Sequence, residues 1–404
     1  MFTVFLIDSI KLNLPGNNTL MKKTLIASAV LGLLVSGAAS ANQETDQLRK
    51  VIADQQKVLK QLERRLDETE KKVEATAEQV DVATSSSSAT KLGGYGELHY
   101  NNIDDKKTMD FHRFVLFASH EFTNKLRFFS ELEIEHVIAS HDEKHPGEVE
   151  LEQAYIEYDF AQNATAKAGL FLVPVGIINE THEPPTFYGV ERNPVEKNII
   201  PATWWEGGAA VNYRPAGGVS FDFALTSGLN VEDDYKVRGG RQKVAKANAD
   251  SLAFTSRVKY TAINGLELAA TVQYQQDMTQ GKVGVDKADA TLVELHGIYQ
   301  ANNFTVKALY ARWDISGDEA KALGRDEQTG WYVEPSYKFN EKVGVFARYA
   351  EYDNNAGNSD DTSKDQTNVG INYYLHENVV LKADWEEHGE SDKNGFNLGV
   401  GYQF

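Results

Sequence analysis

The sequence predicts an all-β protein, an antiparallel transmembrane β-barrel of about 16 strands preceded by an N-terminal coiled-coil helix. From Leu92 onward, apolar and polar residues alternate, as they do when one strand face meets lipid and the other water. The connections between these segments are short and long in turn. Before Leu92, apolar residues recur every seven positions, the spacing of a helix that packs against other helices.

Composition is consistent with this fold class. The chain has 404 residues and a mean hydropathy of -0.44, because lipid-facing and water-facing residues cancel in any average along a barrel strand. The absence of cysteine excludes disulfides and thiolate metal sites. A formal net charge of -18 argues against a nucleic-acid partner, which requires a basic surface.

The first 41 residues predict export. Met21-Lys22-Lys23, a short apolar run and Ala39-Ser40-Ala41 have the layout of a secretory signal peptide over residues 21–41, cleaved before Asn42. Residues 1–20 precede that signal, and we interpret them as an upstream over-extension of the reading frame.

Residues 42–83 form the heptad segment, which contains neither proline nor glycine. Its apolar seam includes Ile52, Leu59, Leu62, Leu66 and Val73. A single amphipathic helix has nothing to bury this seam against, so we interpret the segment as a periplasmic oligomerisation stalk. The alternative is a lone helix that lies on the barrel. A serine-rich linker over residues 84–91 follows.

Residues 92–404 form the predicted barrel, with a first strand near 92–101 and a last near 395–404. Tight connections such as 122–124 alternate with long polar ones such as 228–250. Short turns on one side and long loops on the other are the arrangement of outer-membrane barrels. A soluble all-β chain has no reason to sort its loop lengths in this way.

The final strand, Phe396 to Phe404, has one apolar face that includes Tyr402 and Phe404. It resembles the closing strand of Gram-negative outer-membrane barrels, whose terminal aromatic residue is recognised by the barrel-assembly machinery. This resemblance implies an outer-membrane location, with lipid and lipopolysaccharide as neighbours, and makes Tyr402 and Phe404 the assembly signal. A soluble sandwich that ends this way by accident is the alternative.

The connection Pro174–Glu206 holds most of the nine prolines in the chain. Long ordered loops of this kind are usually functional, and proline prevents this one from extending the sheet. We expect it to fold into the lumen and narrow the pore. The alternative is an ordered extracellular cap.

Three stretches around this loop resemble one family, the phosphate-selective porin O/P family. They are Gly169-Leu170-Phe171-Leu172-Val173-Pro174-Val175-Gly176, Arg192-Asn193-Pro194-Val195-Glu196-Lys197 and Trp204-Trp205-Glu206-Gly207-Gly208. The resemblance implies a trimeric porin of 16 strands that passes anions such as phosphate or carboxylates past an inward loop and pore arginines. The coiled-coil segment is similar to the trimeric dicarboxylate porins of the DcaP type.

The residues themselves leave the charge selectivity open, because basic and acidic side chains balance on the predicted inner faces. The candidate constriction and solute contacts are Arg192, Lys197 and Glu191 in the loop and Arg113, Arg127 and Arg348 on the wall. Arg113 is as well placed to pair with Glu133 or Glu135 across the strands as to contact a solute.

The predicted function is a water-filled channel for passive diffusion of small hydrophilic solutes. We expect no cofactor and no metal, and no catalytic motif is visible, so we do not expect an enzyme. A structural outer-membrane anchor with a periplasmic stalk is the alternative, and an outer-membrane enzyme ranks third.

Overall fold

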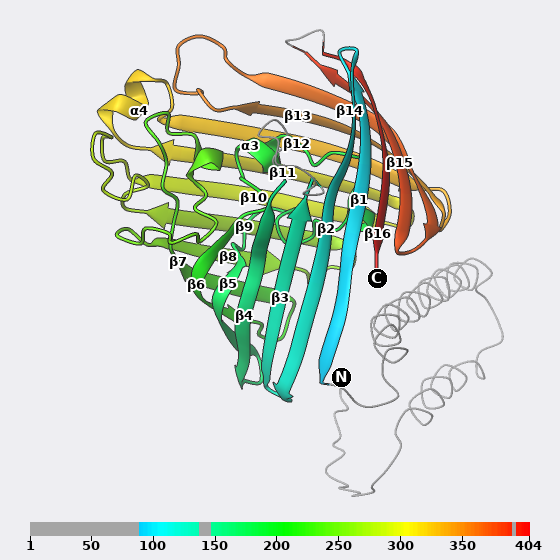
Figure 1. Cartoon of the computed structure of the whole chain (residues 1–404), viewed down its shortest axis with the longest axis horizontal. Helices are drawn as coiled ribbons and strands as arrows, with labels where there is room; N and C mark the ends of the chain where they lie inside the picture. The colour runs from blue at the N-terminus through cyan, green and yellow to red at the C-terminus, as the bar shows by residue number, and fades with distance from the viewer. Residues whose placement is uncertain (1–88, 137–146, 390–392) are drawn as a thin grey trace, which may run out of the picture. The chain divides into compact units, whose positions relative to one another are not determined.

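The computed structural model describes residues 89–136, 147–389 and 393–404, which form a closed antiparallel barrel of 16 strands (Figure 1). The predicted antiparallel barrel of about 16 strands is confirmed. The strands are β1 (Thr90–Ile103), β2 (Lys106–Thr123), β3 (Leu126–Glu135), β4 (Val149–Ala161), β5 (Ala164–Leu172), β6 (Trp205–Tyr213), β7 (Val219–Thr226), β8 (Ala253–Tyr260), β9 (Leu266–Gln275), β10 (Ala290–Ala301), β11 (Phe304–Ile315), β12 (Glu327–Lys338), β13 (Val343–Asp353), β14 (Lys364–His376), β15 (Val379–His388) and β16 (Gly395–Gln403).

The signal peptide and the coiled-coil segment lie outside the described residues. The predicted linker, residues 84–91, ends two residues too late, because Thr90 and Lys91 already belong to β1. The described helical turns are short: η1 (Pro184–Thr186), α3 (Val195–Asn198), η2 (Val237–Gly240) and α4 (Asp318–Ala322). Within the described residues, no helix is long and apolar enough to cross a membrane.

Strand β15 shows how the alternating sequence becomes a two-faced wall. Leu381 and Trp385 are exposed on the outside. Lys382, Asp384 and Glu386 occupy the alternate positions and are buried on the inside. An apolar side chain that stays exposed at every second position is stable only in a lipid environment. The alternation therefore predicts both the strand conformation and the side of the barrel wall on which each charged side chain lies.

The first hairpin differs from the prediction. The sequence predicted that the first strand ends near residue 101, but β1 and β2 continue to a two-residue turn at Asp104 and Asp105. Both aspartates have positive φ angles, 52° and 58°, as the hairpin turn that matches strand twist requires. Aspartate tolerates this conformation better than most residues, so the hairpin extends further than its hydrophobic pattern.

Barrel closure joins β16 to β1. The Phe404 N–H donates to the Gly94 carbonyl at 2.9 Å, and the Gly94 N–H donates to the Phe404 carbonyl at 2.9 Å. The Phe404 ring points outward and packs against Phe114 and Tyr402, with ring centroids 6.3 and 6.4 Å apart. Phe404, the predicted assembly signal, thus also makes the last backbone hydrogen bonds of the pairing that closes the barrel.

An apolar core lies inside the barrel rather than between two layers. Residues 173–204 and the connection between β7 and β8 pack against the inner faces of β10 to β13. Trp204 lies 6.2 Å from Trp313, and the Trp313 Nε1–H donates to the Ile199 carbonyl at 2.9 Å. Apolar side chains therefore fill the side of the interior next to β10 to β13. The side next to β1 to β4 is lined mainly by polar and charged residues.

We predict that two Phe404 variants separate barrel closure from recognition by the assembly machinery. Phe404→Ala keeps both backbone hydrogen bonds to Gly94, so refolding into detergent without the machinery should match wild type. Deleting Phe404 removes both bonds and should destabilise the refolded barrel by about 1–2 kcal/mol. Denaturant titration followed by heat-modifiable migration on gels measures this.

In cells, Phe404→Ala should lower the amount of folded barrel if the aromatic ring is the assembly signal. Wild-type amounts of the alanine variant would contradict that role and leave Phe404 with a closing function alone.

Candidate pore constriction

The loop between β5 and β6 is clamped at its base by Asn179. The Val173 N–H donates to the Trp204 carbonyl at 3.0 Å, which brings the two ends of the loop together. The Asn179 side-chain amide donates to the same two residues' carbonyls, at 2.8 Å to Val173 and 3.0 Å to Trp204. Its side-chain oxygen accepts the Trp204 N–H at 2.6 Å. The single side chain of Asn179 therefore holds both ends of the loop.

A second anchor is the buried carboxylate of Glu196, on α3. It accepts the N–H groups of Ile177 and Ile178 at 2.8 and 2.6 Å and the Tyr332 hydroxyl at 2.8 Å. Burial raises the pKa of Glu196 despite these donors. A Cβ atom on Gly176, whose φ is +73°, would lie 2.7 Å from the carboxylate. Glycine is therefore required where the chain passes this close.

The tip of the loop contacts the inner wall on the β13 to β15 side. The Val190 N–H donates to Asp384 at 2.7 Å, and Lys382 Nζ donates to the Gly189 carbonyl at 2.8 Å. Both wall residues lie on the inner face of β15. The loop starts at β5 and reaches β15, so its middle crosses the interior of the barrel.

Glu191 contacts β1 rather than the neighbouring Arg192. Its carboxylate lies 3.1 Å from His99 Nδ1 and accepts the Asn101 side-chain amide at 3.0 Å. Burial alone would raise the pKa of Glu191, but the hydrogen bond and charge of His99 lower it below its usual range. Glu191 and Glu196 are thus both engaged away from the basic residues that follow them in the sequence.

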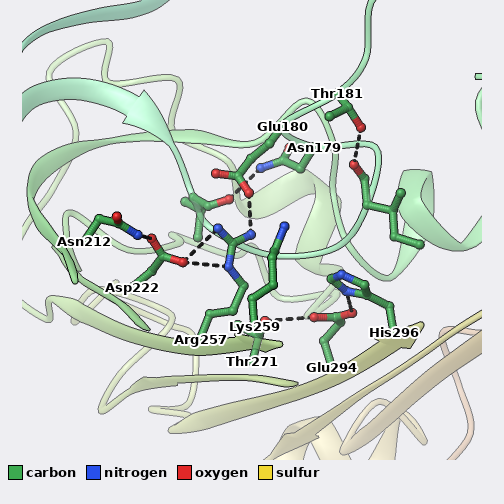
Figure 2. Close-up of polar contacts among 12 residues, drawn as sticks. Asn179, Glu180, Thr181, Asn212, Asp222, Arg257, Lys259, Thr271, Glu294 and His296 are labelled. Atoms are coloured by element: carbon green, nitrogen blue, oxygen red, sulfur yellow. Dashed lines mark hydrogen bonds and ion pairs between the residues drawn. The ribbon is translucent and has the colours of Figure 1, made fainter. Parts of the chain in front are cut away.

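On the opposite side, Arg257 of β8 holds Glu180 of the loop together with Asp222 of β7 (Figure 2). The Arg257 guanidinium lies 2.9 Å from the Asp222 carboxylate. Burial would raise the pKa of Glu180, and the charge of Arg257 lowers it. This ion pair fixes the loop next to Asn179, where the chain leaves the wall.

The three wall arginines that the sequence proposed as solute contacts are engaged by carboxylates. Arg113 lies 2.8 Å from Glu97 and 3.0 Å from Glu133. Arg127 lies 2.5 Å from Glu157 and 2.6 Å from Asp159. Arg348 lies 3.1 Å from Glu334. Each charge is thus balanced by an immediate neighbour. The cross-strand ion pair weighed for Arg113 is what the structure contains.

Three other arginines have a different environment, and we call them the arginine trio: Arg192, Arg238 and Arg241. Arg192 donates to the Thr203 hydroxyl at 2.6 Å, Arg241 to the Thr203 carbonyl at 2.6 Å, and Arg238 to the Ala202 carbonyl at 2.9 Å. Within the described residues, no carboxylate lies within ion-pair distance of any of them. Neutral oxygens orient the trio without cancelling its charge.

Arg238 is affected first by burial and then by the charges of the other two arginines. Burial, together with the charges of Arg241 and Arg192, lowers the pKa of Arg238 to about 9. Nε and Nη2 of Arg192 are buried and donate to no residue in the described part of the chain. Arg192 therefore has unpartnered donors next to the positive charges of Arg238 and Arg241, and guanidinium donors match the oxygens of a carboxylate or phosphate.

Arg192 was predicted from the sequence, whereas Arg238 and Arg241, in the connection between β7 and β8, were not. The pair brackets two glycines, Gly239 and Gly240, in a long polar loop. That spacing allows a tight turn, but nothing local shows that it packs against residues 197–203. Lys197 is exposed and makes no ion pair with any described residue.

The family model of phosphate-selective porin O and P matches residues 92–394. The chain belongs to this family. It is also 32% identical over 336 residues to an uncharacterized protein of Aquifex aeolicus (strain VF5), covering 75% of this chain and 76% of the relative. The resemblance inferred from the loop motifs is confirmed.

Solved structures share the fold at low identity. They include an anion-selective porin from Comamonas acidovorans, with 14% identity, a TM-score of 0.56 and coverage of 78% of this chain and 100% of that one. The outer membrane channel DcaP of Acinetobacter baumannii has 13% identity, a TM-score of 0.53 and coverage of 80% and 99%. The trimer form of in-vitro folded OmpT from Vibrio cholerae has 14% identity, a TM-score of 0.52 and coverage of 78% and 99%.

Family membership makes this porin an outer-membrane channel for small solutes, as the sequence predicted. The structure also explains the motifs that carry the resemblance. The Asn193 side-chain oxygen accepts the Glu196 N–H at 2.8 Å, Glu196 holds the start of the loop, and Trp204 closes its base. Asn193, Glu196 and Trp204 of these motifs therefore position the loop.

We predict that deleting residues 180–198 raises the single-channel conductance, because the deletion removes the segment that crosses the interior. Planar-bilayer recording measures it, and heat-modifiable migration checks that the barrel has folded. Deleting the exposed residues 358–360, in the connection between β13 and β14, is the matched control and should leave conductance unchanged. Unchanged conductance in the 180–198 deletion would show that the loop does not limit flow.

Proposed function

We propose that this porin favours small anions that carry a carboxylate or a phosphate, and that the arginine trio is their contact. The observation behind this proposal is that Arg192, Arg238 and Arg241 have no carboxylate partner among the described residues, whereas Arg113, Arg127 and Arg348 each have at least one. A guanidinium presents two parallel N–H groups, which match two oxygens of a carboxylate or phosphate. Lys197, exposed next to the trio, adds a weaker and more mobile charge.

Acidic residues of β3 and β4 lie near the trio and bear on the path of an anion. Arg241 is within electrostatic range of Glu135, Glu150 and Glu152 on β3 and β4. Lys243 lies 2.7 Å from Glu148 on the same side, which reduces that negative charge only in part. Opposed charges of this kind create a field across the pore, and a field draws anions to the positive side.

We also propose a homotrimer held in part by residues 42–83, with that stalk in the periplasm. The heptad seam supports it, and one structural neighbour is described as a trimer form. Lipid and lipopolysaccharide outside the barrel and the barrel-assembly machinery acting on Phe404 belong to the same proposal. They follow from the exposed apolar outer face and the aromatic C-terminal strand.

We predict that removing the trio shifts the reversal potential in a salt gradient toward cations. A unit charge about 7 Å from a permeating ion in water is worth about 0.6 kcal/mol, which is roughly a threefold change in permeability ratio per arginine. Arg192→Ala should show this effect, and Arg238→Ala with Arg241→Ala should show a larger one. Block by small organic anions should weaken in parallel.

The matched control is Arg127→Ala combined with Glu157→Gln, because this pair of changes removes one basic and one acidic group that contact each other and leaves the net charge of the wall unchanged. Its reversal potential should move less than that of Arg192→Ala. Equal shifts in the two variants would contradict a special role for the trio. A wild-type protein without channel steps would favour the structural anchor instead.

We predict that replacing Leu59, Leu62 and Leu66 with Asp lowers the temperature at which the oligomer dissociates on gels. The substitutions place three charges in the apolar seam. Ala53, Gln61 and Ala75 lie at outer heptad positions, so the same three-Asp change there is the control. If both triple variants dissociate like wild type, residues 42–83 do not hold the oligomer together.

A further inference from the structure

Away from the arginine trio, the loop inserts His182 between two wall glutamates, Glu131 of β3 and Glu152 of β4. We call these three residues the His182 cluster. His182 Nε2 lies 3.3 Å from a Glu131 oxygen and 3.7 Å from a Glu152 oxygen. The exposed fractions are 3% for His182 and 1% for each glutamate. One ligand atom from each residue falls within 4.8 Å of the other two.

A β-bulge places the second glutamate in the cluster. Glu131 pairs with Gln153, whereas the next residue, Leu132, pairs with Leu151, so Glu152 is an extra residue in β4. Bulges re-aim side chains and often occur beside functional sites. Here Glu152 and Gln153 are both buried. The Gln153 amide donates to the second oxygen of Glu131 at 2.6 Å, which fixes that carboxylate.

The orientation of His182 is that of a ligand. Its Nδ1 lies 3.1 Å from the Asn179 carbonyl, which can only accept, so Nδ1 carries a proton. Nε2 then faces the two carboxylates. A histidine that binds a metal commonly donates its other ring N–H to a carbonyl, which sets the tautomer. By contrast, both ring nitrogens of His296 face carboxylates, Glu294 at 2.6 Å and Glu267 at 3.4 Å, as a plain imidazolium would.

The two carboxyl groups of the cluster have few positively charged neighbours within ion-pair distance. Arg113 is already engaged by Glu97 and Glu133. Among the described residues, His182 is the only ion-pair partner of Glu131 and Glu152. Carboxyl groups bind a metal in their ionised form, and a divalent cation at this position would balance both carboxylates.

An unpartnered hydroxyl adjoins the cluster. Tyr95 is fully buried, and its hydroxyl makes no hydrogen bond to any residue in the described part of the chain. It lies within electrostatic range of Glu131 and Glu152, and its ring meets that of His182 edge-on at 5.9 Å. The facing oxygen of Glu152 has no hydrogen-bond partner in the same described residues. Two buried oxygens thus lack the partner that a bound ion would provide.

We propose that the His182 cluster binds one divalent transition-metal ion of the Zn²⁺ class, through Nε2 of His182 and one oxygen each of Glu131 and Glu152. One imidazole and two carboxylates match the ligands and coordination number that Zn²⁺ takes at open sites. Ca²⁺ prefers six or more oxygens, which this cluster does not supply. The ion would fasten the loop to β3 and β4, opposite the contact of Glu180 with Arg257.

The neighbouring acidic groups are weaker candidates. Lys243 already contacts Glu148 and Glu150, so the site that these residues form with Glu135 contains its own cation. Asp110 and His112, near the start of β2, form a more exposed group with His136, which follows β3. That group can bind Zn²⁺ loosely, so the test removes it first.

The test is equilibrium dialysis of the full-length protein in detergent, stripped with a chelator and titrated with Zn²⁺. Every variant carries His112→Gln to disable the exposed group. In this background we expect one tightly bound Zn²⁺ per chain by elemental analysis. His182→Gln and Glu152→Gln should each weaken binding at least tenfold, and His296→Gln, the matched control, should leave it unchanged.

Equal Zn²⁺ stoichiometry and affinity in the His182→Gln and control proteins would overturn the proposal. Displacement of Zn²⁺ by an equal concentration of Ca²⁺ would overturn the assigned metal class. If His182→Gln does not migrate as a folded barrel, Glu152→Gln decides, because it keeps the shape of the bulged residue. Gln153→Leu adds a positioning test, with an expected loss of about 10–100-fold in affinity.

Discussion

The arrangement of the interior depends on one buried carboxylate, that of Glu196. A carboxylate removed from water is stable only when donors or cations surround it, and no cation contacts this one among the described residues. Two backbone N–H groups and the Tyr332 hydroxyl take that role. Meeting this requirement fixes α3 against both the start of the loop and β12. Residues 197–203 come next in the chain, so the position of α3 also fixes their carbonyl groups. Carbonyls of this segment accept hydrogen bonds from Arg238 and Arg241 and orient both side chains.

Much of the fold follows from local pattern. Period-two alternation predicted the strands, and the clustered prolines marked the loop. The exceptions have local causes. The Asp104–Asp105 turn extends a hairpin past its hydrophobic pattern, and Glu152 breaks the alternation at a bulge. Two successive polar residues, Glu152 and Gln153, are the signal of that bulge, yet a strict period of two sends one of them outward.

The site was harder to predict, because it depends on which charges meet. Arg113 and Arg192 are indistinguishable by residue type. Arg113 lies beside Glu135 in the strand register but pairs with Glu133 and Glu97, since side chains lean along the strands. Arg238 meets Arg192 through two loops that are far apart in sequence. No periodicity reports such a contact, so Arg238 and Arg241 could be found only from the fold.

Equal numbers of basic and acidic residues on the wall do not imply a neutral pore. An ion pair presents little net field to a passing solute, because its two charges cancel within a few ångströms. Arg113, Arg127 and Arg348 are balanced in this way and contribute little to selectivity. The field is set by charges whose partners are neutral carbonyls and hydroxyls, as in the arginine trio, or by carboxylates with too few cations. Pairing, rather than the count of charged residues, therefore determines which face of the interior attracts an anion.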